Sequence, residues 1–291
     1  MDRSARSLPG ESTTVDAGAV ELHVRRAGPA DGPPVVLLHG FPEFWYGWRG
    51  QIGPLADAGY RVLVPDQRGY NRSDRPADRR AYGIDRLVGD VAGLLDATGH
   101  AAARVVGHDW GAMVAWLLAA EAPDRVDRLG VLNVPHPGAY VRTLRAEPRQ
   151  ALRSAYAALF RLPRAPEAAL RARNYRLLAR TLTASSRPGT FDERDLERYR
   201  AAWDREGALT GMLNWYRANG LRSGPLGRED RIAPETLILW GARDAALLRG
   251  NAERSLDYCE RGDLAVFEDA THWLHHEYPD AVADRLLAFL D

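Results

Sequence analysis

The chain has 291 residues, of which 45% are hydrophobic, so it is long enough for one large domain with a sizeable core. Its 39 basic residues, all arginine, balance its 39 acidic residues, and a net charge of zero gives no support for a nucleic-acid or membrane partner. With a single cysteine, Cys259, the chain forms no intrachain disulfide and fits a reducing compartment.

From the N-terminus, the first half of the chain alternates strand patterns with helix patterns. Residues 1–15 lack the apolar stretch of a signal peptide, and no apolar run approaches the roughly 18 residues of a membrane span, so we expect a cytoplasmic protein. Residues 19–27 alternate in hydrophobicity and predict an edge strand. Short apolar runs predict buried parallel strands within residues 33–40, 60–69, 103–109 and 125–137. Helical patterns lie near residues 45–58, 84–98 and 111–122.

The second half begins with a different kind of sequence. Residues 138–222 are rich in Arg, Ala and Leu, contain no convincing strand, and show helical patterns that break at prolines and glycines. Strand–turn units return at residues 236–244 and 263–272, and an amphipathic helix pattern follows at 279–290. We therefore expect an α/β fold, with a mostly parallel central sheet covered by helices on both faces. A helical lid, residues 138–222, is inserted into a core domain made of residues 1–137 and 223–291.

Three polar residues come directly after predicted strands: Asp109, Asp244 and His272. Sites in open parallel sheets form at the carboxyl ends of the strands. In chain order these residues are a candidate nucleophile, an acid and a histidine, which is the order of the α/β-hydrolase triad. Asp109 stands at the apex of a strand–turn–helix pattern, between Gly107 and Gly111, where a sharp turn needs small neighbours.

Aspartate at this apex, where serine is usual, indicates a different reaction. A serine that attacked a saturated carbon would leave an ether, whereas a carboxylate leaves an ester that an activated water can cleave. Asp109 therefore points to substitution at a saturated carbon, in an epoxide or an alkyl halide. Two structural alternatives stay open: Asp109 can simply cap the following helix, and Asp244 can simply form a turn.

Several motifs of the chain resemble those of the epoxide hydrolases of the α/β-hydrolase superfamily. They are HGFPEFWYGW (39–48), PDQRGYNRSDRP (65–76), GHDWGAMVAW (107–116), NVPHP (133–137), ALTGMLNWYRA (208–218), WGARD (240–244) and DATHWLHHEYPD (269–280). The resemblance covers nearly the whole chain. It implies the α/β-hydrolase fold with a lid, a small-molecule epoxide and water as reactants, and no cofactor.

The resemblance also implies a role for each triad residue. Asp109 attacks an epoxide carbon, His272 activates the water that cleaves the resulting ester, and Asp244 orients the imidazole and stabilises its charge. His275 and His276 are nearby alternatives to His272, but they lie further into a predicted helix. The three histidines lack a matching second group of ligands, so we expect no metal.

The remaining expectations concern the oxyanion hole, the proton donors and the pocket. The backbone N–H groups of Phe41 and Trp110 are expected to form the oxyanion hole. Tyr216 and, in a more divergent context, Tyr156 match the two lid tyrosines that protonate the epoxide oxygen in this family. The side chains of Phe41, Trp110 and Trp215 predict a largely apolar substrate pocket.

Two other functions remain possible from the sequence. A haloalkane dehalogenase also carries Asp-Trp at the elbow, and it binds the halide through N–H donors. Trp110 with Trp203 or Trp215 could supply these donors, although Phe41, where such enzymes often have Asn, has none in its side chain. The third candidate is a hydrolase-fold binding protein that has lost turnover.

Overall fold

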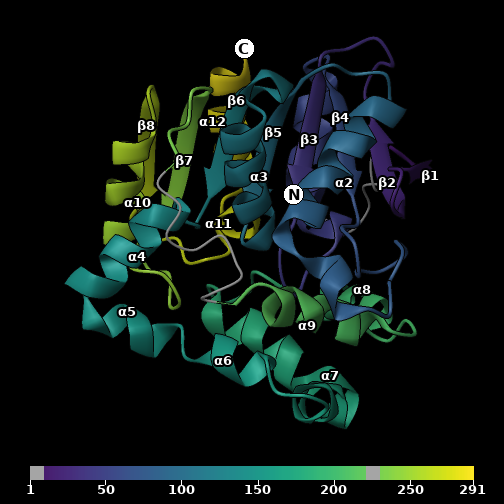
Figure 1. Ribbon diagram of the computed structural model, residues 1–291, viewed down its shortest axis with the longest axis vertical. Helices are drawn as coiled ribbons and strands as arrows, with labels where there is room; N and C mark the ends of the chain where they lie inside the picture. Colours follow the sequence, from purple (N-terminus) through teal and green to yellow (C-terminus); the bar gives the residue numbers. More distant parts are fainter. Residues whose placement is uncertain (1–9, 221–229) are drawn as a thin grey trace.

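The computed structural model describes residues 10–220 and 230–291, so the expected lid boundary at residues 222 and 223 lies outside the described residues. In Figure 1 an eight-stranded sheet occupies the upper part of the molecule, and a layer of helices lies below it. The strands, in chain order, are β1 (Glu11–Asp16), β2 (Glu21–Ala27), β3 (Pro34–Leu38), β4 (Arg61–Pro65), β5 (Ala103–His108), β6 (Val126–Leu132), β7 (Glu235–Gly241) and β8 (Gly262–Phe267).

The strand order is β1-β2-β4-β3-β5-β6-β7-β8, and all pairs from β4 to β8 are parallel. The predicted parallel strands are therefore confirmed. The edge position predicted for residues 19–27 is wrong, because β2 pairs with β1 on one side and with β4 on the other. The edge strand is β1, whose polar sequence ESTTVD is mostly exposed and so carries no apolar run.

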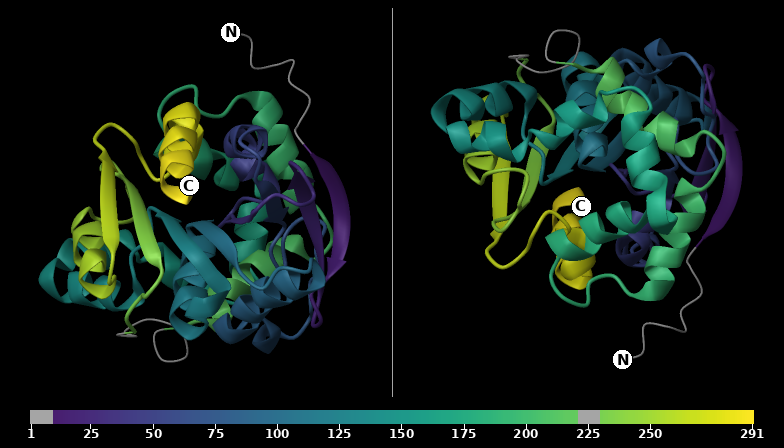
Figure 2. Two further views of the ribbon diagram at one scale, coloured as in Figure 1. Left: turned by 90° about the horizontal axis from the view of Figure 1, so that it is seen from above. Right: turned by 90° about the horizontal axis from the view of Figure 1, so that it is seen from below.

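Helices cover both faces of the sheet, as expected. They are α1 (Arg49–Asp57), α2 (Ile84–Ala97), α3 (Trp110–Glu121), α10 (Gly250–Ser255), α11 (Leu274–Glu277) and α12 (Pro279–Leu290). Helices α1 and α12 pack together on one face, and α2 packs beside α3 on the other (Figure 2). None of the described helices has both the length and the apolar character needed to cross a membrane.

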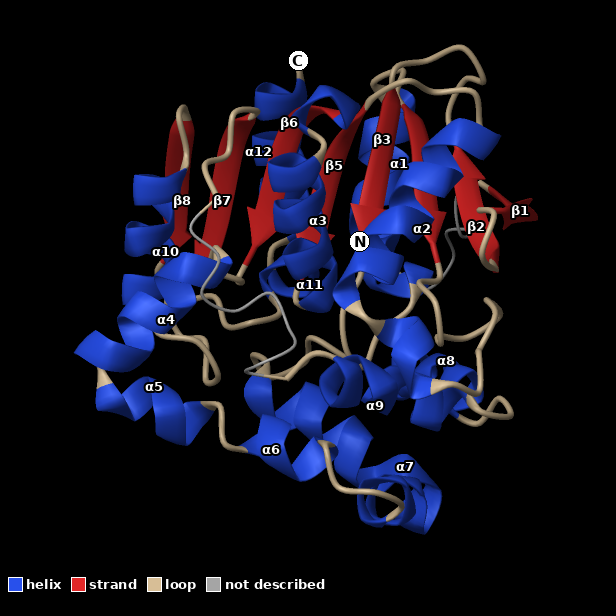
Figure 3. Ribbon diagram, viewed as in Figure 1, coloured by secondary structure: helices blue, strands red, loops and turns tan. Residues whose placement is uncertain are grey.

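Between β6 and β7 the described chain contains helices and no strand, which confirms that prediction for its described part. The helices are α4 (Pro137–Ala146), α5 (Pro148–Arg153), α6 (Tyr156–Phe160), α7 (Ala165–Ser185), α8 (Glu193–Trp203) and α9 (Ala208–Ala218). Non-helical backbone at residues 172–175 interrupts α7. Figure 3 shows the strands of the parallel sheet pointing toward α6 and α9, so these helices lie over the carboxyl ends of the strands.

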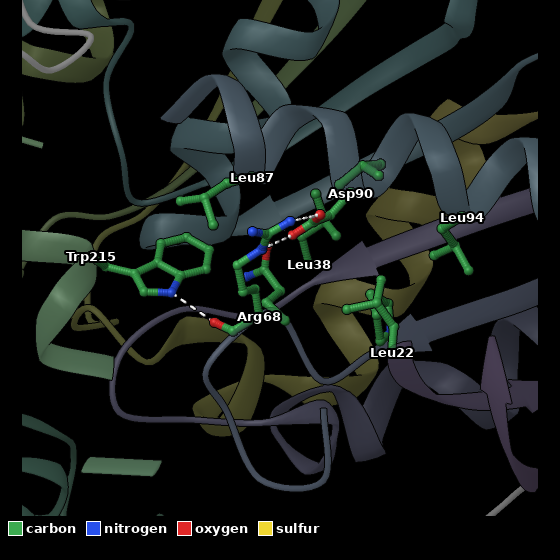
Figure 4. Close-up of a pocket in the computed structure, with 10 residues that line it drawn as sticks. Leu22, Leu38, Arg68, Leu87, Asp90, Leu94 and Trp215 are labelled. Atoms are coloured by element: carbon green, nitrogen blue, oxygen red, sulfur yellow. Dashed lines mark hydrogen bonds and ion pairs between the residues drawn. The ribbon is translucent and has the colours of Figure 1, made fainter. Parts of the chain in front are cut away.

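Two buried tryptophans attach this helical layer to the sheet domain. The indole N–H of Trp203 donates to the carbonyl of Pro42 at 2.6 Å, and that of Trp215 donates to the carbonyl of Arg68 at 2.9 Å. Arg68 in turn forms a buried ion pair with Asp90 of α2 (Figure 4). The cavity that these residues surround has a volume of about 10 Å³, so it is too small for a substrate.

Candidate active site

Asp109 occupies the sharp turn between β5 and α3. Its backbone has φ 51° and ψ −126°, a left-handed conformation that costs free energy for any residue other than glycine. The side chain does not cap α3. Instead, its Oδ1 accepts a hydrogen bond of 2.7 Å from the backbone N–H of Phe41, so the turn aims the carboxylate away from the helix.

The backbone around this turn leaves no room for side chains at two glycines. A Cβ on Gly111 would collide with the carbonyl oxygen of Leu38, and a Cβ on Gly40 would collide with the side chain of Asp109. Gly111 therefore lets α3 start against β3, and Gly40 lets the loop that carries Phe41 approach the carboxylate.

Asp244 and His272 complete a chain of contacts with Asp109. His272 Nδ1 lies 2.7 Å from Asp244 Oδ2, and His272 Nε2 lies 3.6 Å from Asp109 Oδ2. Asp244 follows β7 and His272 follows β8, so the carboxyl ends of separate parallel strands bring these groups together. One imidazole thus has a carboxylate on each side.

Asp244 is buried, and four donors surround its carboxylate. Oδ1 accepts hydrogen bonds from the backbone N–H groups of Ala246 and Leu247, at 2.7 and 2.9 Å, while Oδ2 faces His272 and accepts one of 2.6 Å from Asn133. Burial alone would raise the pKa of Asp244, but His272 and Asn133 hold it below its ordinary value. Asp244 therefore both shapes its turn and faces the histidine as a carboxylate.

The two carboxylates determine the protonation of His272. Burial alone would lower the pKa of His272, but Asp244 and Asp109 outweigh it and raise this pKa to about 10. Burial likewise opposes ionisation of Asp109, yet His272 and the Phe41 N–H keep the pKa of Asp109 below its ordinary value. At neutral pH the unreacted site thus holds an imidazolium between two carboxylates.

A cavity of about 430 Å³ opens over Asp109. Its lining is mostly apolar and comes from the turn at Asp109 and the start of α3, from the segment after β6 and from the helical layer. The residues include Asp109, Trp110, Met113, Val134, Leu144, Tyr156, Ala157, Arg161, Tyr216 and Leu247. Its volume suits a small organic molecule.

Both predicted tyrosines line this cavity. Tyr216 of α9 is buried, and its ring lies 5.2 Å from the ring of Trp110 and 6.5 Å from that of Tyr156. Tyr156 of α6 is 41% exposed, yet its phenol lies close enough to Asp109 for the two charges to interact. Burial, reinforced by Asp109, raises the pKa of both phenols, so both stay protonated at neutral pH.

The three aromatic residues expected in the pocket lie at different depths. Trp110 lines the cavity. Trp215 is set behind Trp110, with ring centroids 5.8 Å apart, and Phe41 packs against Phe160 and Tyr216. Neither Phe41 nor Trp215 is among the described lining residues, so Phe41 reaches the site through its backbone N–H and Trp215 supports Trp110 from behind.

Glu43 lies at the centre of a second buried cluster, which the sequence analysis did not identify. It accepts hydrogen bonds of 2.6 Å from Tyr199 and from Nε2 of His276, and His275 Nε2 lies 3.3 Å away. Glu43, His275 and His276 are close enough to share a cation. However, the guanidinium of Arg49 donates to His276 Nδ1 at 2.8 Å, so both ring nitrogens of His276 are engaged and a positive charge already lies beside it. This donor set favours a hydrogen-bond network over a metal.

Sequence reasoning also missed the groups that fix the loop between β7 and α10, residues 242–249, which carries Asp244 and is called the acid loop below. Asn133 stands in the NVPHP motif with a left-handed φ of 49°, which could have marked it as a residue with a special backbone role. Arg153 of α5 donates to the carbonyl of Asp244 at 2.8 Å. Gln150 is fully buried, and its amide bonds Ala246, Leu248 and Asn251. No pattern in the sequence links α5 to a loop almost a hundred residues away.

Comparisons with known proteins agree with this geometry. A family model described as alpha/beta hydrolase fold matches residues 33–279. YfhM of Bacillus subtilis (strain 168), an AB hydrolase superfamily protein, is 46% identical over 95% of this chain and 96% of its own length. Epoxide hydrolase A of Mycobacterium tuberculosis (strain ATCC 25618 / H37Rv) is 36% identical over 95% of this chain and 96% of that protein. The crystal structure of epoxide hydrolase A from Mycobacterium thermoresistibile has a TM-score of 0.85 at 33% identity and covers 96% of this chain and 98% of that one. The chain therefore belongs to the epoxide hydrolase family, a family of hydrolases within the α/β-hydrolase superfamily.

Proposed function

We propose that the protein hydrolyses a small-molecule epoxide to a vicinal diol through a covalent ester on Asp109. The observation that carries the proposal is the arrangement at Asp109: one carboxylate oxygen is held by an N–H, the other faces His272, and two protonated tyrosines line the same cavity. The helical layer, residues 138–222, acts as the lid on a core formed by residues 1–137 and 223–291. The reaction takes place in the cytoplasm.

In the first step, Oδ2 of Asp109 attacks an epoxide carbon, and the C–O bond to that carbon breaks. This oxygen is the one without the Phe41 hydrogen bond, so its lone pairs are available. The departing alkoxide takes a proton from Tyr156 or Tyr216, both of which keep their protons until a strong base arrives. Apolar walls exclude bulk water that would compete as the proton donor.

Formation of the ester prepares the second step. The negative charge of Asp109 disappears, so one of the two influences that raise the pKa of His272 is lost, and its proton passes to the tyrosinate. Neutral His272 then takes a proton from water, and the hydroxide adds to Cγ of Asp109. The N–H of Phe41, with that of Trp110, stabilises the tetrahedral oxyanion. Its collapse releases the diol, which takes a proton from His272, and the acid proton of Asp109 returns to the imidazole.

A haloalkane dehalogenase is supported less well, because both tryptophans that could act as the second N–H donor for a halide, beside Trp110, are engaged elsewhere. The indole of Trp203 donates to Pro42 and that of Trp215 to Arg68. Neither indole can turn toward the cavity without losing a buried hydrogen bond. Phenol hydroxyls near Asp109 instead suit a leaving group that becomes an alkoxide.

The experiment that tests the proposal compares the wild type with Asp109→Ala on a panel of aryl and alkyl epoxides, with the diol measured by chromatography. Asp269→Ala is the matched control, because this carboxylate is exposed and lies outside the cavity. We expect diol from the wild type and the control, and a loss of about 10⁴-fold or more in Asp109→Ala. Equal diol from all three would contradict the proposal. Diol from none, with halide released from haloalkanes, would favour the dehalogenase, and ligand binding without any turnover would favour the binding protein.

A further inference from the structure

The outer surface of the helical layer carries exposed apolar side chains. Within residues 10–220 and 230–291, the large hydrophobic side chains that remain exposed all lie between residues 152 and 177. One of them, Tyr156 (41% exposed), lines the cavity over Asp109, and the others are Leu152 (79%), Leu159 (63%), Leu162 (50%) and Leu177 (50%). Exposed leucines that are concentrated in one segment of the chain are unfavourable in water, and such concentrations mark interaction surfaces.

The same segment carries a strong positive charge, which the net charge of zero conceals. Residues 138–191 contain 11 arginines and two acidic residues, while the rest of the chain contains 28 arginines and 37 acidic residues. Ten arginines of this segment are exposed. Arg142 pairs with Asp257 and Arg187 lies over the ring of Tyr278, whereas the other eight have no carboxylate partner among the described residues. They are Arg145, Arg149, Arg161, Arg164, Arg171, Arg173, Arg176 and Arg180.

These residues lie on α4 to α7 and on the turns between them, and α5, α6 and α7 form the end of the molecule farthest from the sheet (Figure 1). Seen from below, these helices face the viewer (Figure 2). Helix α5 supplies Ala151 to the cavity over Asp109, α6 supplies Tyr156 and Ala157, and Arg161 follows α6 directly. Apart from Arg161, these exposed leucines and arginines do not line the cavity, although they belong to the helices and turns that enclose the candidate active site.

We propose that this surface, formed by α5, α6 and α7, docks onto a bilayer that contains anionic lipid. Arginines attract the anionic headgroups, and the leucines between them enter the boundary between headgroups and acyl chains, as on an amphipathic helix that lies in the membrane interface. Where the proposed function holds, docking brings the cavity beside a phase in which apolar epoxides dissolve.

Charge alone would also suit a nucleic acid, but the leucines favour a lipid surface. Binding to nucleic-acid backbones uses arginines and stacking aromatic groups, and exposed aliphatic side chains contribute little to it. In a bilayer the same leucines leave water. The combination on one surface therefore selects the membrane.

The test measures flotation of the full chain with vesicles of phosphatidylcholine alone, and with vesicles that also contain phosphatidylserine. Leu152→Ser with Leu159→Ser removes apolar groups, and Arg176→Gln with Arg180→Gln removes charge. All four side chains are exposed and none lines the cavity. The matched control is Arg261→Gln with Arg285→Gln, which removes two exposed charges outside this segment.

We expect the wild type to bind the anionic vesicles and not the neutral ones. Each lid pair should weaken this binding about tenfold or more, and the control pair should leave it unchanged. Absence of binding to anionic vesicles, or equal loss in the control pair, would overturn the proposal. So would a duplex DNA that competes the protein off the vesicles while the leucine pair binds as the wild type does.

Vesicle binding needs no turnover, so its outcome is separate from that of the proposed function. All variants are also assayed on a water-soluble epoxide without vesicles, where we expect wild-type rates. If binding is confirmed and no variant or wild type makes diol, the docking surface stands and the proposed reaction falls.

Discussion

At the scale of single residues, the two oxygens of Asp109 have different surroundings, and this predicts where each oxygen of the diol comes from. Oδ2 becomes part of the product, because it forms the bond to carbon. In a single turnover in oxygen-18 water we therefore expect an unlabelled diol and a labelled Asp109, measured by mass spectrometry of the product and of the peptide. Label in the diol of the first turnover would mean that water attacks the epoxide directly.

His272 gives a second prediction at this scale, because its two carboxylate neighbours act at different steps. In the free enzyme the pKa of His272 is raised to about 10, and loss of the Asp109 charge lowers it in the ester. The deprotonated imidazole is the base, so ester hydrolysis should accelerate as pH rises through this lowered pKa, whereas ester formation should be insensitive to pH near neutrality.

Asp244→Asn tests the same pair. The change removes the carboxylate that holds the imidazolium, so it lowers the pKa of His272 and loosens its orientation. We expect ester hydrolysis to slow by about 10³-fold or more, while ester still forms. Rapid quenching followed by intact-protein mass spectrometry would detect the accumulated ester. Slowing of both steps to the same degree would contradict this division of roles.

At the scale of elements, helix α5 is fastened to the acid loop and is followed directly by α6, which carries Tyr156. Gln150→Met keeps the side-chain volume but removes the hydrogen bonds to half-buried Ala246 and Leu248 and to buried Asn251. We expect a loss of about 1–3 kcal/mol in the free energy of unfolding. Ester formation should slow more than ester hydrolysis, because α5 no longer fixes the position of α6, and with it Tyr156, relative to the loop after β7.

The control for this prediction is Leu286→Ala, a fully buried change on α12. It should destabilise by about 2–5 kcal/mol and leave the ratio of the two rates unaltered. Urea unfolding gives the stabilities, and single-turnover kinetics give the rates. If the ratio changes equally in both variants, α5 has no specific positioning effect.

The same scale shows which elements the sequence could predict. Strands such as β3 and β5 are buried along most of their length, so each carries a short apolar run that is easily recognised. The only described strand with which β1 pairs is β2, and the polar, mostly exposed sequence of this edge strand carries no such signal. The local pattern of residues 19–27 correctly predicts a strand. Its position in the sheet depends on pairing with β1 and β4, which the local pattern does not encode.

At the scale of the whole molecule, the sequence predicts those site residues that both follow a strand and have a side chain that the reaction needs. Asp109 and His272 follow strands and have residue types that the reaction needs, so the sequence identifies them. Asn133 and Gln150 act by supporting the acid loop, and amides occur in every kind of loop. The depth of Trp215 depended on how α9 packs against the core, which no single segment encodes.

The buried histidines around Glu43 together make the free energy of unfolding depend on pH. Burial, the largest influence, lowers the pKa of His108 and His276 to about 4 and that of His275 to about 3. In the unfolded chain these groups titrate near 6.5, so between about pH 6.5 and 4 the unfolded state binds more protons than the folded state.

Stability from these histidines is thus fully present above pH 6.5 and is lost as pH falls toward 4. His272 has the opposite sign: because its pKa is raised to about 10, its contribution is fully present below about pH 6.5 and is lost as pH rises from there to about 10. We expect the contribution of these groups to the free energy of unfolding, measured in urea, to be greatest near pH 6.5. Its slope near pH 5.5 should correspond to uptake of about two or more protons on unfolding. A free energy of unfolding that stays constant from pH 8 to pH 5 would show that the Glu43 cluster is already protonated in the folded protein, with imidazolium groups shared around its carboxylate.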